Sequence, residues 1–535
     1  MNLALAKCNT LIIDDFQGMR TMLKDFVKSM GITKIDLAAN GKEAIALLGA
    51  NKYDIVICDY NLGPGQNGQQ ILEEAKHKKH IGYTAIWMMV TAEKTADMVM
   101  GAAETKPDDY LLKPINAALL EGRLEKLLSR KQSLGPIEKA VKNGDYATAL
   151  ALCDSQMKSQ PAAAHDLLRI KADLLLDSGS LDAAKTLFEQ VLAKRAIPWV
   201  KTGLGKVYFL SNDLLRAREI FQEVLEESKM YLEAADWLAR TLEALGDKEQ
   251  AQKVLQGAME LSPNSPTRQK NLADTAYRNG ALDVAHAAYD KAIKLSEHSV
   301  HKNPAVYAGL AKVLTDKDAP QDALNVLNKS LAEFKGDDEA ALQSTVLQSM
   351  AYSKMGDAKK AQEAIDEADK KMAAMGGKVS AEVTMDMAKS LFRMGDKDKA
   401  CEMLQSVVKN NHDNQNLIAQ VEAVFESEQL EEEGSKLIKS SQQEVIDINN
   451  QGVLLGREGK FEEGAKLLRK AAQNLPNNVV ILMNLCGMLL GLLKETGRDD
   501  RLIYEAKNAL GRVQELQPGH KNFLEYMHAV NEFDK

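Results

Sequence analysis

The stretch YDIVICD, at residues 53–59, is a largely apolar run that ends on an aspartate. Its last apolar residues would face both sides of a sheet and include β-branched side chains, which is typical of a central parallel strand. Runs at residues 10–13, 85–90 and 110–112 have a similar form, with segments of helical period between them. The alternation predicts an α/β domain over residues 1–125, with right-handed crossovers and helices on both faces of a parallel sheet.

Polar side chains stand where these strands end, and they belong to Asp14, Asp15, Asp59, Thr91 and Lys113. In an open parallel sheet, ligands bind at the carboxyl ends of the strands. Three carboxylates gathered there would repel one another without a cation, and a set of oxygen ligands favours Mg²⁺. Asp59 follows the middle strand and is the candidate nucleophile. Lys113 adds a positive charge and the Thr91 hydroxyl can donate a hydrogen bond, so the set predicts a phosphoryl-transfer site.

Each part of this set also has an ordinary structural reading. An Asp-Asp pair after a strand is often only the N-cap of a helix, and Lys-Pro is often only a turn. Because such residues occur at all four strand ends, a phosphoryl-transfer site is favoured over an isolated N-cap and an isolated turn.

At these residues the chain resembles the receiver domains of response regulators, including the single-domain chemotaxis receivers. The resemblance rests on IDDF at 13–16 with Met19-Arg20, DYN at 59–61, VTA at 90–92 and DYLLKP at 109–114. It implies a doubly wound, flavodoxin-like fold. It also implies that Asp59 accepts a phosphoryl group from the phosphohistidine of a histidine kinase or a phosphotransfer protein.

The same resemblance implies roles for the remaining site residues. Mg²⁺ is expected among three carboxylates and one main-chain carbonyl, those of Asp14, Asp15, Asp59 and Asn61. Thr91 and Lys113 are expected to sense the phosphoryl group, and Tyr110 is expected to be the rotating switch aromatic.

Two segments depart from the usual receiver pattern. After Asp59, the segment LGPGQNG at 62–68 replaces a Met-Pro turn and looks one residue longer than the commonest form. Before the last strand, ETKP at 104–107 replaces a more usual Gly-Ala pair. We therefore expect the site to be retained, with altered partner contacts or phosphate lifetime and an altered output face.

Beyond Ser133 the sequence repeats itself. Small residues that close a Gly-Asp-like phrase recur at intervals of 35, 33, 34 and 34 residues, at Ala149, Ala184, Ala217, Ala251 and Ala285. This is the period of a helical-hairpin array. In each unit the Gly allows a left-handed turn, Asp or Ser caps the second helix, and the Ala allows close helix packing.

The later units drift in length. Ala323, Ala361 and Ala400 follow at intervals of 38, 38 and 39 residues, a weak unit passes near Gly434, a clearer one covers 459–464, and a divergent pair lies near Ala506. The array resembles tetratricopeptide repeats, although the Trp and Tyr of that family are mostly absent, so related helical-hairpin repeats remain an alternative. About eleven hairpins are expected.

The expected organisation is a receiver domain at 1–125, a helix extension and linker at 126–136, and an all-α, tetratricopeptide-like solenoid at 137–535. The concave face of such a solenoid is expected to bind a protein or peptide partner. No catalytic residues are expected outside the receiver. His298 and His301 could share a metal only with a third ligand, which the nearby sequence does not offer.

Composition limits the other classes of function. The formal net charge of −8 argues against a large nucleic-acid surface. Five cysteines without a C-x-x-C pair indicate neither a disulfide framework nor a zinc site, and a cytoplasmic location is expected. The apolar stretch 479–493 contains Asn484 and is shorter than the roughly 20 residues that span a bilayer, so a buried helix is expected instead of membrane insertion.

These observations favour a two-component signalling protein that is not an enzyme, in which phosphorylation of Asp59 controls partner binding by the repeats. An alternative is a phosphate sink, or a phosphatase acting on a shared kinase or regulator. A further alternative is a constitutive scaffold in which the receiver only docks.

Overall fold

The computed structural model describes residues 5–92, 105–131, 134–160, 163–376, 378–517, 520 and 522–534. Ser133 and Glu104, which belong to segments discussed above, lie outside these ranges. Two compact units emerge from the contacts between residues. The first comprises 1–175, 184–275 and 287–302, and the second comprises 176–183, 276–286 and 303–535.

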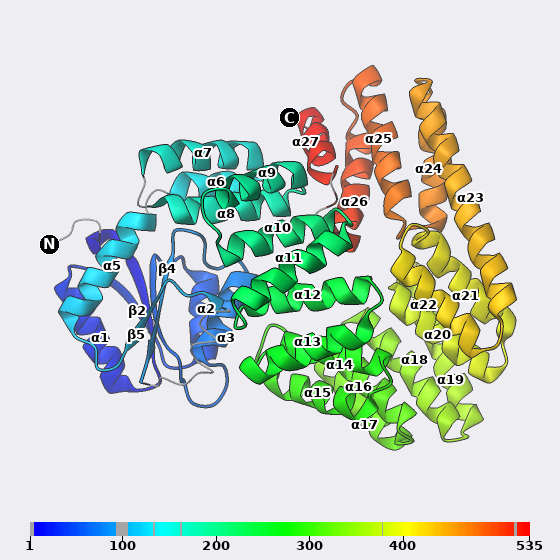
Figure 1. Cartoon of the computed structure of the whole chain (residues 1–535), viewed down its shortest axis with the longest axis horizontal. Helices are drawn as coiled ribbons and strands as arrows, with labels where there is room; N and C mark the ends of the chain where they lie inside the picture. Colours follow the sequence, from blue (N-terminus) through cyan, green and yellow to red (C-terminus); the bar gives the residue numbers. More distant parts are fainter. Residues whose placement is uncertain are drawn as a thin grey trace. The chain divides into compact units, whose positions relative to one another are not determined.

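The sheet of the first unit (Figure 1) consists of five parallel strands. Their order is β2-β1-β3-β4-β5. They are β1 (Asn9–Ile13), β2 (Lys34–Ala38), β3 (Ile55–Asp59), β4 (Ile86–Thr91) and β5 (Asp109–Leu112). Every residue of β3 and β4 is buried, whereas the edge strands β2 and β5 are only partly buried. The continuous apolar runs are thus the inner strands, as the sequence predicted.

Helices cover both faces of this sheet. The helices α1 (Gln17–Ser29) and α5 (Ala117–Lys131) pack on one core with Ile55 and Ile57, while α2 (Gly41–Ala50) and α3 (Gly68–His77) pack on a second core with Val56 and Cys58. Successive side chains of β3 therefore point into opposite cores, as the pleat of a strand requires. The predicted doubly wound α/β fold is confirmed.

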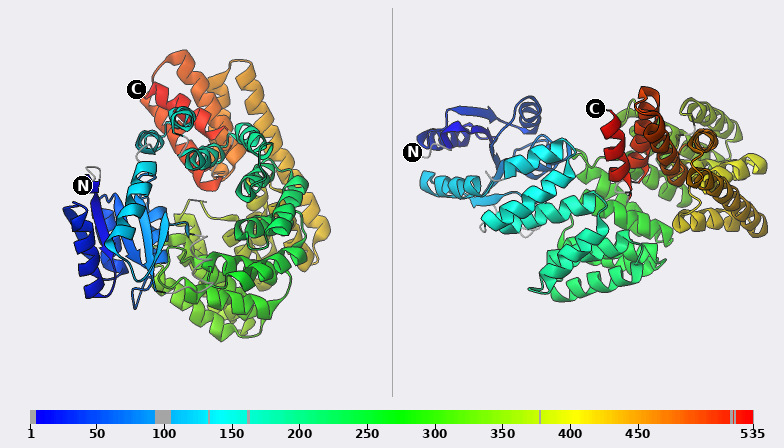
Figure 2. Two further views of the ribbon diagram at one scale, coloured as in Figure 1. Left: turned by 60° about the vertical axis from the view of Figure 1, so that its left-hand side comes forward. Right: turned by 90° about the horizontal axis from the view of Figure 1, so that it is seen from above.

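The first unit continues with helices that follow one another as hairpins along the chain (Figure 2). They are α6 (Gly135–Lys142), α7 (Tyr146–Ser159), α8 (Ala164–Asp177), α9 (Leu181–Leu192), α10 (Pro198–Leu210), α11 (Leu214–Glu227), α12 (Leu232–Ala244), α13 (Lys248–Leu261), α14 (Pro266–Arg278) and α15 (Leu282–Leu295). The parts of α8, α9, α14 and α15 within 176–183 and 276–286 belong to the second unit. The alanines of the 34-residue period are buried, with no exposed surface on Ala149, Ala184, Ala217, Ala251 or Ala285. They let the paired helices approach closely, as expected.

The turns of these hairpins have the predicted chemistry. Gly144 and Gly246 have φ values of 72° and 83°, in the left-handed region. The side chain of Asp145 accepts a hydrogen bond from the amide of Thr148, and Asp247 does the same for Gln250. The sequence phrase therefore marks a real boundary between two helices.

The second unit contains the remaining helices. They are α16 (Pro304–Asp316), α17 (Pro320–Glu333), α18 (Asp338–Lys354), α19 (Ala358–Ala374), α20 (Ala381–Met394), α21 (Lys397–Asn410), α22 (Gln415–Ser427), α23 (Glu431–Arg457), α24 (Phe461–Asn474), α25 (Val479–Thr496), α26 (Asp500–Leu516) and α27 (Phe523–Phe533). The helices α18 and α19 have 17 residues each, against 13 or 14 for α10 to α13, which accounts for the intervals that end at Ala361 and Ala400. The first interval of 38 residues, which ends at Ala323, instead contains the long connection 296–303 between α15 and α16.

The helix α23 is continuous over 27 residues and serves two hairpins. Near its start Gly434 packs against Phe425 of α22, and farther along Gly452 packs against Leu468 of α24. Residues 435–451 contain neither Gly nor Pro, so nothing in the sequence ends a helix there. The weak unit near Gly434 is therefore fused to the next one.

The helix α25 is long and apolar enough to cross a membrane, by length and composition alone. Its apolar residues, such as Ile481, Leu485 and Leu489, are buried in a core shared with α24 and α26. This burial is what the sequence led us to expect of the stretch.

Candidate phosphoacceptor site

Three carboxylates converge where β1 and β3 end. These strands are parallel neighbours with Ile13 opposite Cys58, so the residues that follow lie side by side. One oxygen from each of Asp14, Asp15 and Asp59 lies within 4.8 Å of the others. Asp14 is 1% exposed and Asp59 is 8% exposed, whereas Asp15 is open to solvent. This all-oxygen donor set with one open side fits Mg²⁺, which keeps several water ligands.

An arginine holds the loop after β1 in place. Nη1 of Arg20 donates hydrogen bonds to the main-chain oxygens of Asp14 and Asp15, at 2.6 and 3.0 Å. The amide of Phe16 donates to Oδ1 of Asp14 at 2.9 Å. Arg20 was part of the motif on sequence, but its contact with these carbonyls depends on the path of the loop and was not foreseen.

Lys113, directly after β5, reaches two of the carboxylates. Its Nζ lies 2.8 Å from Oδ2 of Asp59 and 3.1 Å from Oδ2 of Asp14. Burial alone would lower the pKa of Lys113, but its hydrogen bonds and charge interactions with Asp59 and Asp14 outweigh burial and raise the pKa above 10.5. Lys113 therefore stays protonated beside the carboxylates.

Asp59 is buried and closely packed. Burial raises the pKa of its carboxyl above 3.8, and the hydrogen bond from Lys113 offsets this only in part. A Cβ atom at Gly68 would come within 2.2 Å of the main-chain oxygen of Asp59, so the start of α3 can lie here only with glycine. Asn67 caps that helix together with Gln70, so the longer turn after Asp59 ends in a well-capped helix.

The remaining predicted residues lie nearby. Thr91 ends β4, is 2% exposed, and accepts a hydrogen bond from the Lys113 amide through its main-chain oxygen at 2.8 Å. Asn61 is exposed and follows Asp59 by two residues. Both positions are compatible with contact to a group bound at Asp59, and their roles remain predictions.

Tyr110 points into the domain. Its hydroxyl is buried and has no hydrogen-bond partner among the residues that the structure describes. Burial, followed by the nearby Tyr60 and Cys58, raises the pKa of Tyr110 to about 12. The side chain therefore lies inward as a neutral phenol, and its role as a switch stays a prediction.

Comparison with protein families finds two kinds of domain. The response regulator receiver domain family matches residues 10–125. Tetratricopeptide repeat families match residues 169–231, 208–274 and 383–412.

Curated relatives resemble the first part of the chain. The chemotaxis protein CheY of Pseudomonas aeruginosa is 31% identical over 120 residues, which cover 22% of this chain and 95% of that protein. The chemotaxis protein CheY-3 of Vibrio cholerae is 30% identical over 120 residues, 91% of its length.

Solved structures match each part separately. A two-component response regulator from Clostridium difficile is 30% identical, with 24% of this chain and 99% of that chain covered and a TM-score of 0.22. A tetratricopeptide repeat protein from Parabacteroides merdae is 14% identical, with 58% and 98% covered and a TM-score of 0.35.

Proposed function

Since this chain belongs to the response regulators, with a CheY-like receiver domain followed by tetratricopeptide repeats, we propose that it is a phosphorylation-dependent signalling protein of a two-component system. Asp59 accepts a phosphoryl group from a histidine kinase or phosphotransfer protein, and the repeat array binds a protein partner under its control. The observation that carries the proposal is the pairing of Lys113 with Asp59 and Asp14 beside a third carboxylate.

The chemistry follows from these side chains. A carboxylate oxygen of Asp59 attacks phosphorus, the P–N bond of the phosphohistidine breaks, and its electron pair stays on the imidazole nitrogen. When bound among Asp14, Asp15, Asp59 and the main-chain carbonyl of Asn61, Mg²⁺ would neutralise charge on the phosphoryl oxygens. Lys113 then pairs with a phosphoryl oxygen in place of the carboxylate, and the Thr91 hydroxyl donates to another.

The output follows from the change of charge. A phosphoryl group adds about −1.5 to −2 charges, which draws Lys113 and Thr91 toward it, while Tyr110 rotates as the switch aromatic. We place the protein in the cytoplasm, without nucleic acid or membrane insertion, and with no enzymatic activity beyond hydrolysis of its own acyl phosphate.

The test uses the full chain and its Asp59→Asn variant with acetyl phosphate and MgCl₂. We expect intact-mass spectrometry to find one phosphoryl group on the wild type and none on the variant. Hydrogen exchange in the repeats should change on phosphorylation of the wild type alone. A phosphorylated protein with unchanged repeats would instead support the scaffold, or the phosphate sink if the phosphoryl group is also lost rapidly.

A further inference from the structure

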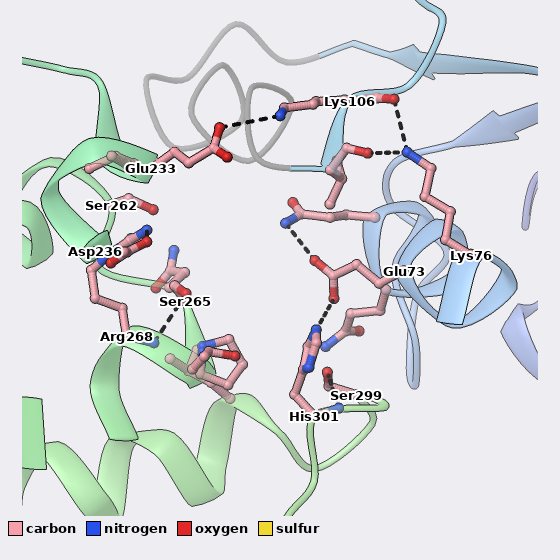
Figure 3. A pocket seen from close by; sticks show the side chains of 18 of the residues that line it. Glu73, Lys76, Lys106, Glu233, Asp236, Ser262, Ser265, Arg268, Ser299 and His301 are labelled. Carbon is pink, nitrogen blue, oxygen red and sulfur yellow. Dashed lines mark hydrogen bonds and ion pairs between the residues drawn. The ribbon is translucent and has the colours of Figure 1, made fainter. Parts of the chain in front are cut away.

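A cavity of about 1040 Å³ lies within the first unit, between the receiver and the helices α12 to α15 (Figure 3). One wall is formed by the receiver, with Glu73 and Lys76 of α3 and with Lys106 before β5. The other wall comes from the repeats. It includes Arg169, Glu233, Asp236, Arg268 and His301. The cavity is thus lined by opposed charged side chains from two parts of the chain.

On the receiver side, α3 holds the segment before β5. Nζ of Lys76 donates hydrogen bonds to the main-chain oxygens of Thr105 and Lys106 (Figure 3). Lys106 has a φ of 49°, which is uncommon for a residue other than glycine. Its Nζ extends across the cavity to lie 3.6 Å from Oε2 of Glu233 on α12. Lys106 is therefore presented to the repeats by a fixed backbone.

On the repeat side, Glu233 is kept ionised. Burial alone would raise its pKa, but the charges of Lys206 and Lys106 outweigh burial and lower the pKa below 4.5. Beside it, Arg268 of α14 is 3% exposed and donates to both carboxylate oxygens of Asp236, at 2.8 and 2.9 Å. This bidentate pair makes a rigid wall next to Glu233, which also accepts a hydrogen bond from Nζ of Lys206.

A histidine and a carboxylate face each other on the other side of the cavity. Nε2 of His301 lies 3.8 Å from Oε2 of Glu73 on α3. His301, for which the sequence offered no metal site, thus faces a carboxylate of the receiver. The two pairs have opposite polarity, since the receiver offers a cation to Glu233 and an anion to His301.

Both receiver contacts connect closely to the phosphoacceptor. The amide of Gly68, which begins α3, donates to the main-chain oxygen of Tyr60 at 2.8 Å, directly after Asp59. Lys106 precedes Lys113 by seven residues, with β5 between them. A short stretch of chain thus joins Lys113 to Lys106, and a hydrogen bond joins the turn after Asp59 to α3.

We propose that this cavity is the partner site of the repeats, that the partner is a protein segment with a basic side chain for Glu233, and that Lys106 fills that position until Asp59 is phosphorylated. The charge complementarity of the present contact is the argument for the basic side chain. Consecutive hairpins supply Lys206, Glu233 and Arg268, so the site is built by the array itself. The proposal rests on the proposed function for its control by phosphorylation.

The test measures how readily the Glu233 carboxylate is coupled to a primary amine from solution. The full chain is treated with biotin-cadaverine and a water-soluble carbodiimide, and mass spectrometry measures the amide formed at each carboxylate. Lys106→Ala should raise labelling at Glu233 several-fold, while Lys106→Arg, which keeps the cation, should leave it low. Glu226 of α11 is exposed and serves as the internal reference. Equal labelling of Glu233 in the wild type and Lys106→Ala would overturn the proposal.

A second experiment tests separately whether phosphorylation of Asp59 regulates this site. Beryllofluoride with MgCl₂ imitates the acyl phosphate and should raise Glu233 labelling in the wild type but not in Asp59→Asn. If only Lys106→Ala raises labelling, the site stands and the control by Asp59 fails. Lys24→Ala, on α1 at the opposite face of the sheet, should change neither result.

Discussion

Oε2 of Glu138, on α6, accepts hydrogen bonds from both the amide and the hydroxyl of Thr84, at 2.9 and 2.8 Å. Thr84 lies just before β4, so this contact joins the receiver to the first helix of the array. The carboxylate also fills the space where a side chain at Gly82 would lie, because a Cβ atom there would come within 2.1 Å of it. The junction between the two parts is therefore packed.

This contact predicts a pH-dependent loss of stability in Glu138→Gln. Burial alone would raise the pKa of Glu138, but hydrogen bonds from Lys142 and Thr84 outweigh it and lower the pKa below 4.5. A carboxyl group whose pKa is lower in the folded than in the unfolded state stabilises the fold at pH values above its unfolded-state pKa. This stabilisation is lost as the pH falls through the folded-state pKa. We expect the variant to lose about 2 kcal/mol at pH 7 and less at about pH 4, in urea unfolding. An equal loss at both pH values would contradict this.

Lys113→Ala should impair both stability and phosphorylation. It leaves the buried carboxylates of Asp14 and Asp59 without their counter-charge, which costs about 3 kcal/mol. It should also slow phosphorylation by acetyl phosphate about 100-fold, since one donor to the transferred group is lost. Adding Asp59→Asn should recover much of the stability, because one of the stranded charges is then gone. No recovery in the double variant would show that the loss is not electrostatic.

Removal of one acidic ligand should separate metal binding from folding. We expect MgCl₂ to raise the melting temperature of the wild type with increasing concentration, as ligand binding to the native state requires. Asp15→Asn should lose this increase, yet be no less stable than the wild type in EDTA, because one of three repelling carboxylates is neutral. Asp25→Asn, an exposed carboxylate on α1, should keep the full magnesium effect.

Two glycines should respond in opposite ways to alanine. Gly68→Ala forces a methyl group to within 2.2 Å of the Asp59 main-chain oxygen, so we expect a loss of about 2 kcal/mol and slower phosphorylation. Gly122→Ala, on α5, meets nothing within 4 Å and should gain about 0.5–1 kcal/mol from helix propensity. Thermal unfolding of both variants checks the pair, and a neutral Gly68→Ala would contradict the predicted clash.

Tyr110→Phe should be neutral or stabilising by up to about 1 kcal/mol. The hydroxyl that it removes is buried without a hydrogen-bond partner in the described part of the chain, so no bond is lost. A loss of more than about 1 kcal/mol in urea unfolding would show that the hydroxyl is bonded in solution.

The sequence predicted features that depend on local period. The strand ends that carry Asp14, Asp59 and Lys113 follow from apolar runs, and the buried Ala149 and its successors follow from the 34-residue spacing. These signals can be read from sequence because the pattern of apolar and small residues within one strand or one hairpin reflects that element's own packing.

The contact between Lys106 and Glu233 could not be predicted in this way. The two residues are far apart in the chain, and their approach depends on the path of α12 and on the backbone at Lys106. The sequence showed only that the segment before β5 departs from the common receiver pattern. The role of Arg20 was missed for a similar reason, since main-chain carbonyls leave no mark in a sequence.

The continuous helix α23 has a mechanical consequence. Its first half contributes Ile438 to the core around α20 to α22, and its second half contributes Val445 to the core around α24 to α26. Loops elsewhere in the array can act as hinges, but a rigid rod shared by two cores cannot bend between them. Repeat arrays generally unfold unit by unit from their ends. Here the hairpins on either side of α23 should yield together under load, as one step in a force-extension trace.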